Sequence, residues 1–178
     1  MPLKILLIVF AAAQLIVLPL CAQMDKREPL TSAQVEEIRE AGIYPVERVK
    51  LYTKYLNEHA DSLKSLTSRA HSAARVQRID NELKDFAALL DELGSNLDTY
   101  SDRHADIRLA LKPLNEATPH WQEILRALPG EHGFDLSRKE AIEAGDDLAD
   151  QAKRLEQEQL EYFRIHKDEK GQERAEPK

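Results

Sequence analysis

The feature that most constrains this chain is the regular spacing of its apolar side chains between residues 49 and 114. In the first of two runs, the steps between successive positions alternate between three and four residues, through Val49, Tyr52, Leu56, His59, Leu63, Leu66, Ala70 and Ala73. This spacing places the side chains in one narrow stripe along an α-helix, close to the heptad pattern of coiled coils. No comparable run alternates with a period of two, the pattern of half-buried strands. The sequence therefore predicts an all-α fold.

The second run begins at Val76 and continues through His104 to Leu114, but it is out of phase with the first. The stretch that joins the runs, residues 65–72, is rich in serine and threonine, which favour caps and turns over helix interiors. We therefore expect a coiled-coil-like helical hairpin that turns within this stretch. The alternative is one continuous helix of about 70 residues, about 100 Å long at about 1.5 Å per residue.

Capping residues and prolines divide the rest of the chain. Thr31 followed by Gln34 has the capping-box pattern, which predicts a short helix that ends at Gly42. Pro45 suits the first position of the next helix, where its missing N–H group has no partner to lose. Farther along, Pro113 and Pro119 are expected to bracket a connector.

The last third of the chain predicts two more helices. A short one is expected from Pro119 to Leu128, capped by Thr118. Ser137 and Glu140 form a second capping box, so a long helix is expected to begin at Ser137. This helix should run to about His166. The expected architecture is an antiparallel bundle of three long helices plus two short helices, in which helices that follow each other in the chain pack side by side.

The first 22 residues are expected to be a secretory signal peptide. They carry one charge, at Lys4, and then an uninterrupted apolar run from Ile5 to Ala13. A basic start, an apolar stretch of about 7–15 residues and a small residue at the cleavage site are typical of such peptides. We expect cleavage after Ala22 and export to the periplasm or the exterior, with no transmembrane span left after cleavage. The alternatives are a lipoprotein anchored through Cys21 and an uncleaved anchor.

The remaining residues divide into three parts by composition. Residues 23–30 are polar and contain a proline, as expected of a linker. Residues 31–166 hold the helical patterns and are expected to form one bundle domain. Residues 167–178 have Ala175 as their one apolar side chain, so a disordered charged tail is expected there.

The composition and the motifs exclude several classes of protein. A single cysteine cannot form an intramolecular disulfide, and a net charge of −7 is unsuited to general binding of nucleic acids. There is no Gly-rich phosphate loop, no G-X-S-X-G elbow, no H-E-X-X-H pair and no C-X-X-C-H haem motif. We therefore expect no enzyme activity, no catalytic residue, no cofactor site and no metal site.

Two sets of side chains are candidate metal ligands. Asp98, Asp102 and Asp106 stand four apart on one helix face and cannot wrap an ion, so a solvated acidic face is expected there, and the other candidates are histidines and one glutamate. His59 and His104 both fall on the apolar stripe, but a hairpin would separate them by more than about 30 Å along the bundle axis. Each is expected to point to the edge of the bundle or to bind a backbone carbonyl. His120 and Glu123 supply at most two ligands at the surface.

Charge is unevenly distributed along the chain. No acidic residue lies between Asp61 and Asp80, whereas this stretch, at the expected hairpin turn, contains the basic residues Lys64, Arg69, Arg75 and Arg78. Five acidic residues crowd the beginning of the last helix: Glu140, Glu143, Asp146, Asp147 and Asp150. With antiparallel neighbours the two groups would lie toward opposite ends, and the molecule would be electrically polar along its length. The basic residues are the expected patch for a protein partner or an anionic component of the envelope.

Taken together, these features predict a non-enzymatic helical interaction module of the cell envelope, such as an adaptor, a scaffold or a holding chaperone. The first alternative is a structural homodimer formed through the long hairpin, whose narrow stripe could pair with a second copy. A metal- or cofactor-binding bundle is the least favoured class, because the sequence contains no ligand cluster.

Overall fold

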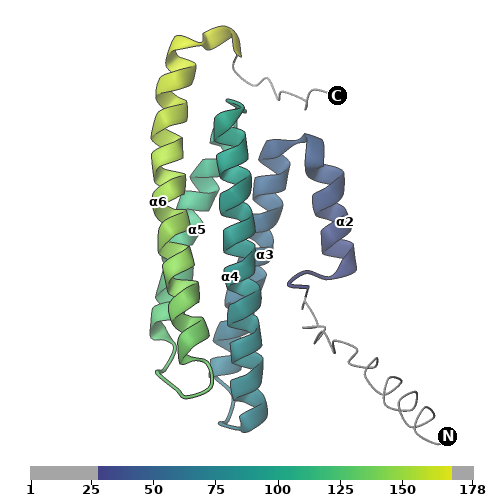
Figure 1. Cartoon of the computed structure of the whole chain (residues 1–178), viewed down its shortest axis with the longest axis vertical. Helices are drawn as coiled ribbons and strands as arrows, with labels where there is room; N and C mark the ends of the chain where they lie inside the picture. The colour runs from purple at the N-terminus through teal and green to yellow at the C-terminus, as the bar shows by residue number, and fades with distance from the viewer. Residues whose placement is uncertain (1–27, 170–178) are drawn as a thin grey trace, which may run out of the picture.

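A computed structural model describes residues 28–169, and this part of the chain is helical, with no strand in that range. The predicted all-α class is confirmed. The elements are α2 (Ser32–Glu40), the 3₁₀ helix η1 (Ala41–Ile43), α3 (Pro45–Thr67), α4 (Ala73–Asp102), α5 (Arg108–Ala127), α6 (Asp135–Ile165) and the 3₁₀ helix η2 (Lys167–Glu169). Figure 1 shows α3 to α6 as a bundle, with α2 folded back along the outside of α3.

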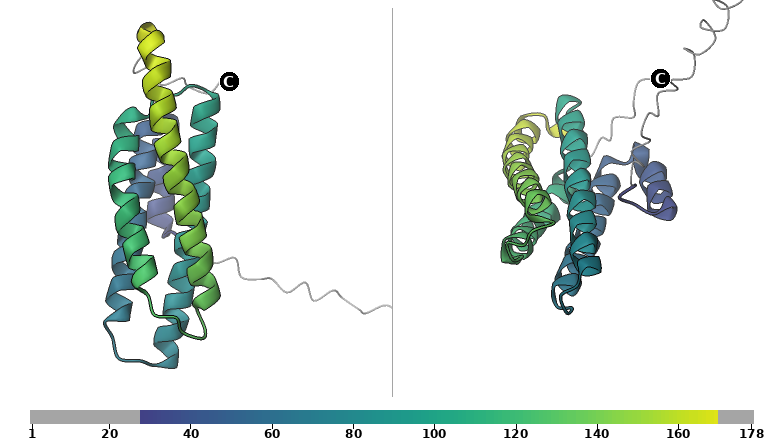
Figure 2. Two further views of the ribbon diagram at one scale, coloured as in Figure 1. Left: turned by 90° about the vertical axis from the view of Figure 1, so that its left-hand side faces the viewer. Right: turned by 60° about the horizontal axis from the view of Figure 1, so that its bottom comes forward.

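The four long helices are connected across a diagonal of the bundle. Helix α3 is adjacent to α4 and α5, and α6 is adjacent to the same two helices, whereas α4 and α5 face each other diagonally across the core. Because the chain reverses direction at each turn, the neighbours α3 and α5 run parallel, as do α4 and α6 (Figures 1 and 2). The expected three long and two short helices are wrong, because residues 28–169 form four long α-helices and one short one. Antiparallel packing of helices that follow each other in the chain holds for α3 with α4 and for α5 with α6, and fails for α4 with α5.

The turn between α4 and α5 lies where the apolar spacing of the sequence predicts a continuous helix. The apolar spacing continues through Tyr100, His104 and Ile107, yet α4 ends at Asp102. His104 adopts a left-handed backbone conformation with φ of 52°, which ends the helix. The buried amide of Gln159 on α6 then holds the loop, donating to the carbonyl of Ala105 at 2.7 Å and accepting from the N–H of Ile107 at 3.1 Å. The turn is therefore stabilised by contacts with α6, and no capping or turn motif in the local sequence predicts it.

The two prolines expected to bracket a connector lie inside α5 instead. Pro119 cannot donate to the carbonyl of Asn115, and the Thr118 hydroxyl donates to that carbonyl at 3.4 Å. Burial of Leu114 and Trp121 on the inner face keeps the segment helical across both prolines. The expected connector over 113–119 and the short helix capped by Thr118 are therefore wrong.

The predicted helix ends are confirmed in part. The turn between α3 and α4 lies between Thr67 and Ala73, as predicted, so the alternative of one continuous helix is wrong. The capping box of Thr31 is confirmed, because its N–H donates to the Gln34 side chain at 2.9 Å and its hydroxyl accepts from the Gln34 N–H at 3.3 Å. The second box is wrong, since α6 begins two residues before Ser137.

Ser137 instead joins α6 to α4. Its hydroxyl is buried and donates to Oδ1 of Asp80 at 2.6 Å, while the Lys84 ammonium donates to Oδ2 at 2.8 Å. Burial alone would raise the pKa of Asp80. The hydrogen bonds from Lys84 and Ser137, together with the Lys84 charge, outweigh burial and hold that pKa below its ordinary value.

This arrangement predicts a pH-dependent contribution to stability. A carboxyl whose pKa is lowered by folding stabilises the protein above its unfolded pKa, and this stability is lost as the pH falls through the folded pKa. Asp80→Asn should therefore lower the free energy of unfolding by about 1–3 kcal/mol at neutral pH. The difference should shrink below about pH 4. Urea denaturation at neutral pH and below about pH 4 measures this difference in the free energy of unfolding, with exposed Asp91→Asn as the control. An equal loss under both conditions would contradict the lowered pKa of Asp80.

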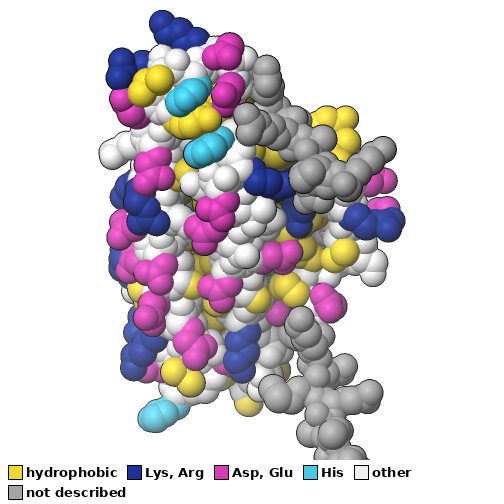
Figure 3. Space-filling view, turned by 45° about the horizontal axis from the view of Figure 1, so that its top comes forward, with side chains coloured by type: hydrophobic (Ala, Val, Ile, Leu, Met, Phe, Trp, Pro, Cys, Tyr) yellow, Lys and Arg dark blue, Asp and Glu magenta, His cyan; other side chains and the backbone are white. Residues whose placement is uncertain are grey.

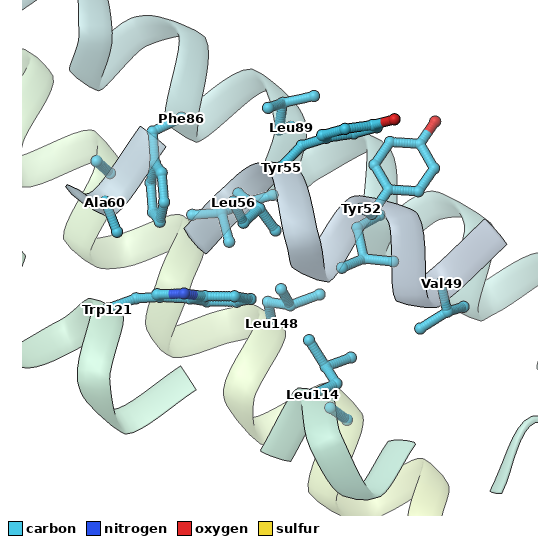
Figure 4. Close-up of a cluster of buried hydrophobic side chains, with 14 of the residues drawn as sticks. Val49, Tyr52, Tyr55, Leu56, Ala60, Phe86, Leu89, Leu114, Trp121 and Leu148 are labelled. Atoms are coloured by element: carbon cyan, nitrogen blue, oxygen red, sulfur yellow. The ribbon is translucent and has the colours of Figure 1, made fainter. Parts of the chain in front are cut away.

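The core runs the length of the bundle and contains most of its aromatic side chains. Trp121 on α5 lies edge-on to Phe86 on α4, with ring centroids 6.0 Å apart (Figure 4). The indole N–H of Trp121 donates to Oδ1 of Asn57 on α3 at 2.7 Å. One side chain thus connects three helices.

The expected terminal segments are only partly described. The signal peptide over 1–22, the cleavage site and Cys21 lie outside residues 28–169, as do most of the linker and most of the tail. Leu30, at the end of the expected linker, is buried in the core cluster. Residues 167–169, at the start of the expected tail, form η2, where Glu169 accepts a hydrogen bond from the Tyr162 hydroxyl at 2.8 Å.

Candidate functional site

The long helices divide into an acidic pair and a slightly basic pair. Helices α4 and α6, which lie side by side, together carry sixteen acidic and eight basic residues. Helices α3 and α5 carry five acidic and seven basic residues. Figure 3, which looks onto the α4 and α6 side from above, shows acidic side chains distributed along it. The molecule is therefore electrically polar across its width.

The expected polarity along the length is wrong, and the parallel packing of α4 and α6 is the reason. The beginning of α6 lies beside the beginning of α4, as the bond between Ser137 and Asp80 shows. The acidic residues at 140–150 therefore lie in the same half of the bundle as the basic turn. Glu131, in the loop before α6, pairs directly with Arg75 at 2.8 Å and with His71 at 2.5 Å.

A shallow groove follows the contact between α4 and α6. It consists of two open hollows, which share Asp91, Ala144 and Asp147. Small side chains form much of its surface, from Ala87, Ala88, Gly94 and Ser95 on α4 and from Ala144 on α6. The groove is concave because these positions lack bulk.

Acidic side chains flank the groove on both helices. Asp91 and Asp98 come from α4, and Glu140, Glu143 and Asp147 come from α6. All five are exposed, and none has a basic group of residues 28–169 within ion-pair distance. The one basic side chain in the lining, Lys84, is paired with Asp80. The negative charge of the groove is therefore not neutralised within the described part of the chain.

The upper part of the groove is fixed by one amide. Nε2 of Gln151 on α6 donates to the carbonyl of Gly94 at 3.0 Å and to Oδ1 of Asp98 at 2.6 Å. A Cβ atom at Gly94 would lie 3.1 Å from Oε1 of Gln151, so the absence of a side chain there permits this close approach. Gln151 thus joins α4 and α6 in the hollow that Gly94 and Asp98 line.

Of the four basic residues expected to form a patch, Arg75 has a partner within the chain. Arg75 is 9% exposed, and its guanidinium is committed to Glu131. Lys64 lines a separate groove between α3 and α5, and Arg69 and Arg78 are exposed on the turn and on α4. Lys64, Arg69 and Arg78 are thus the residues of the expected patch that remain available to a partner. Its binding role stays a prediction.

The histidines weighed as ligands have other partners. Nδ1 of His59 lies 2.7 Å from Oε1 of Glu82, which links α3 to α4. The ring of His104 stacks on Tyr162, with centroids 4.3 Å apart. His120 and Glu123 lie in the groove that contains Lys64. Within residues 28–169, no group of three or more His, Cys, Asp or Glu side chains is placed to hold a metal ion.

A polar cluster between α3 and α4 is better explained by structure than by chemistry. The Tyr52 hydroxyl donates to Oε1 of Glu92 at 2.5 Å. Burial, and then the hydrogen bond to Glu92, raise the pKa of Tyr52 to about 12. The phenol therefore remains a neutral donor at physiological pH, and its hydrogen bond to Glu92 links α3 to α4.

Sequence reasoning missed the groove. The sequence shows the acidic residues of α6, but it does not show that they lie beside Asp91 and the small residues of α4. No local signal in the sequence shows that α4 and α6 are neighbours, because an apolar stripe indicates which face of a helix is buried and not which helix packs against it. The groove follows from that adjacency.

Comparison with protein-family models, with curated proteins and with solved structures gave no match to this chain. In the part that the structure describes, no helix combines the length and apolar character needed to cross a bilayer.

Proposed function

We propose that this chain is a non-enzymatic interaction module of the cell envelope, and that its α4/α6 groove docks a cationic segment of a partner protein. The observation that carries the proposal is the flanking of one concave surface by five carboxylates that lack basic partners among residues 28–169. Placement in the envelope rests on the apolar N-terminal stretch of the sequence.

The electrostatics favour a basic partner over a second copy. A cationic surface would approach the groove with its charges complementary to the carboxylates, which increases the association rate and selects the orientation. Two α4/α6 faces brought together would instead place like charges opposite each other, which costs free energy. A homodimer through this face is therefore disfavoured.

Photo-crosslinking in the native envelope tests the proposal. A photoreactive residue at position 88, exposed in the groove, is compared with one at position 109 on α5, where Leu109 is 78% exposed. We expect a discrete adduct from position 88, in which the crosslinked segment of the partner is rich in Lys and Arg. No equivalent adduct should form from position 109.

A charge series identifies the cause of any adduct. Neutralising the groove with Asp91→Asn, Glu143→Gln and Asp147→Asn should reduce the adduct from position 88 at least tenfold. The matched control removes three exposed carboxylates on α3 and α5, with Asp61→Asn, Glu116→Gln and Glu123→Gln, and should leave the yield unchanged. An adduct that forms equally from position 109, or that survives neutralisation of the groove, would overturn the proposal.

A further inference from the structure

The proposed docking groove also restricts the conformation of its occupant, which is an inference that rests on the proposed function. The lining on α4 extends from Lys84 to Asp98. At about 1.5 Å per residue this stretch is about 21 Å long. A helix of about 14 residues, or four turns, has the same length. A bound segment can thus contact the whole groove as a short helix.

The walls of the groove offer no sheet edge to which the backbone of an extended peptide could add. Both walls are helices, and the carbonyl and N–H groups of their interiors are already paired within α4 and α6. An extended peptide gains affinity mainly by adding its backbone to a sheet edge, and this groove has none. A helical segment satisfies its own backbone and needs only side-chain contacts.

The lining suits the surface of a helix. The wall positions lie along one face of each helix, at 84, 87, 88, 90, 91, 94, 95 and 98 on α4 and at 140, 143, 144, 147, 148 and 151 on α6. Small residues in the middle permit the close approach of a third helix. Carboxylates on both sides are placed for Lys or Arg along the two flanks of that helix.

We propose that the occupant of the α4/α6 groove is an amphipathic basic helix of the partner, which presents a small or apolar stripe to Ala87, Ala88 and Ala144 and basic side chains to the carboxylates on either side. In its bound state it lies along the groove as an additional helix of the bundle.

Synthetic peptides test this inference by NMR titration of the isotope-labelled protein. The probe is a 15-residue peptide with an Ala/Leu stripe flanked by lysines. One control has the same composition in scrambled order, and a second contains two prolines that prevent helix formation. We expect the patterned peptide to bind at least tenfold more tightly than either control, with shift changes at the groove. Ala88→Phe, which fills the groove without changing charge, should abolish this difference.

The outcomes separate the inference from the proposal on which it rests. Equal binding of the three peptides, or unchanged preference in Ala88→Phe, would overturn the helical occupant. If binding in that case is still lost with Asp91→Asn, Glu143→Gln and Asp147→Asn, cationic docking stands. Absence of binding by all three peptides would also overturn the helical occupant, and the native crosslinking experiment then decides the proposed function independently.

Discussion

Replacing Trp121 with alanine is expected to destabilise the bundle by about 3–5 kcal/mol, a loss typical of buried aromatic side chains. Trp121 is 1% exposed and contacts the edge of Phe86 (Figure 4). Its removal leaves a cavity where α3, α4 and α5 meet. It also removes the indole N–H group from which Oδ1 of Asn57 accepts a hydrogen bond.

Urea denaturation of the folded domain measures this effect. Leu136→Ala is the matched control, since Leu136 is 70% exposed at the beginning of α6 and its loss should change stability by less than about 0.5 kcal/mol. Trp121→Phe should fall between the two, because it keeps most of the ring volume. A loss below about 1 kcal/mol for Trp121→Ala would contradict the central position of this side chain.

Gly145→Ala is expected to destabilise the protein by about 1–2 kcal/mol, although alanine favours a helix over glycine by about 1 kcal/mol. A Cβ atom at Gly145 on α6 would lie 2.3 Å from Nε2 of Gln122 on α5. Gln122 is buried, and its Nε2 donates to the carbonyl of Ile142 at 3.3 Å. Accommodating the methyl group must displace this amide and break its bond.

Removing the Gln122 side chain is expected to reverse the sign of the stability change caused by Gly145→Ala. With Gln122→Ala already present, the space beside position 145 is open, so the further change Gly145→Ala should stabilise the protein by about 1 kcal/mol through helix propensity. A double-mutant cycle with urea denaturation isolates the coupling of the two positions. Additive effects would show that Gln122 does not limit the approach of α5 to α6.

Local signals in the sequence succeeded where local interactions decide the structure. The capping box at Thr31 formed because its two hydrogen bonds need only residues 31 and 34. The same pattern at Ser137 failed, because Asp80 on another helix provides a buried acceptor for the hydroxyl. The stripe through His104 failed for a related reason, since Gln159 holds a loop where the spacing alone predicts a helix.

The groove lay beyond sequence reasoning because it depends on which helices are neighbours. The stripes of α4, α5 and α6 are each compatible with several partners, and the choice depends on fits such as that of Gly145 against Gln122. Once α4 and α6 are adjacent and parallel, residues almost sixty positions apart, such as Asp91 and Asp147, flank the same hollow. The acidic excess of each helix was visible in the sequence, whereas their combination was not.

The adjacency of α4 and α6 is the claim on which the groove, its charge and its occupant all depend. Disulfide trapping tests it most directly, in a Cys21→Ser background that removes the one native cysteine. Asp98 and Gln151, whose side chains are hydrogen bonded at 2.6 Å, are both replaced with cysteine, and Ser95 with Lys112 forms the comparison pair on α4 and α5. We predict rapid intramolecular oxidation of the 98/151 pair and none of the 95/112 pair. Oxidation of the 95/112 pair without that of the 98/151 pair would contradict the account.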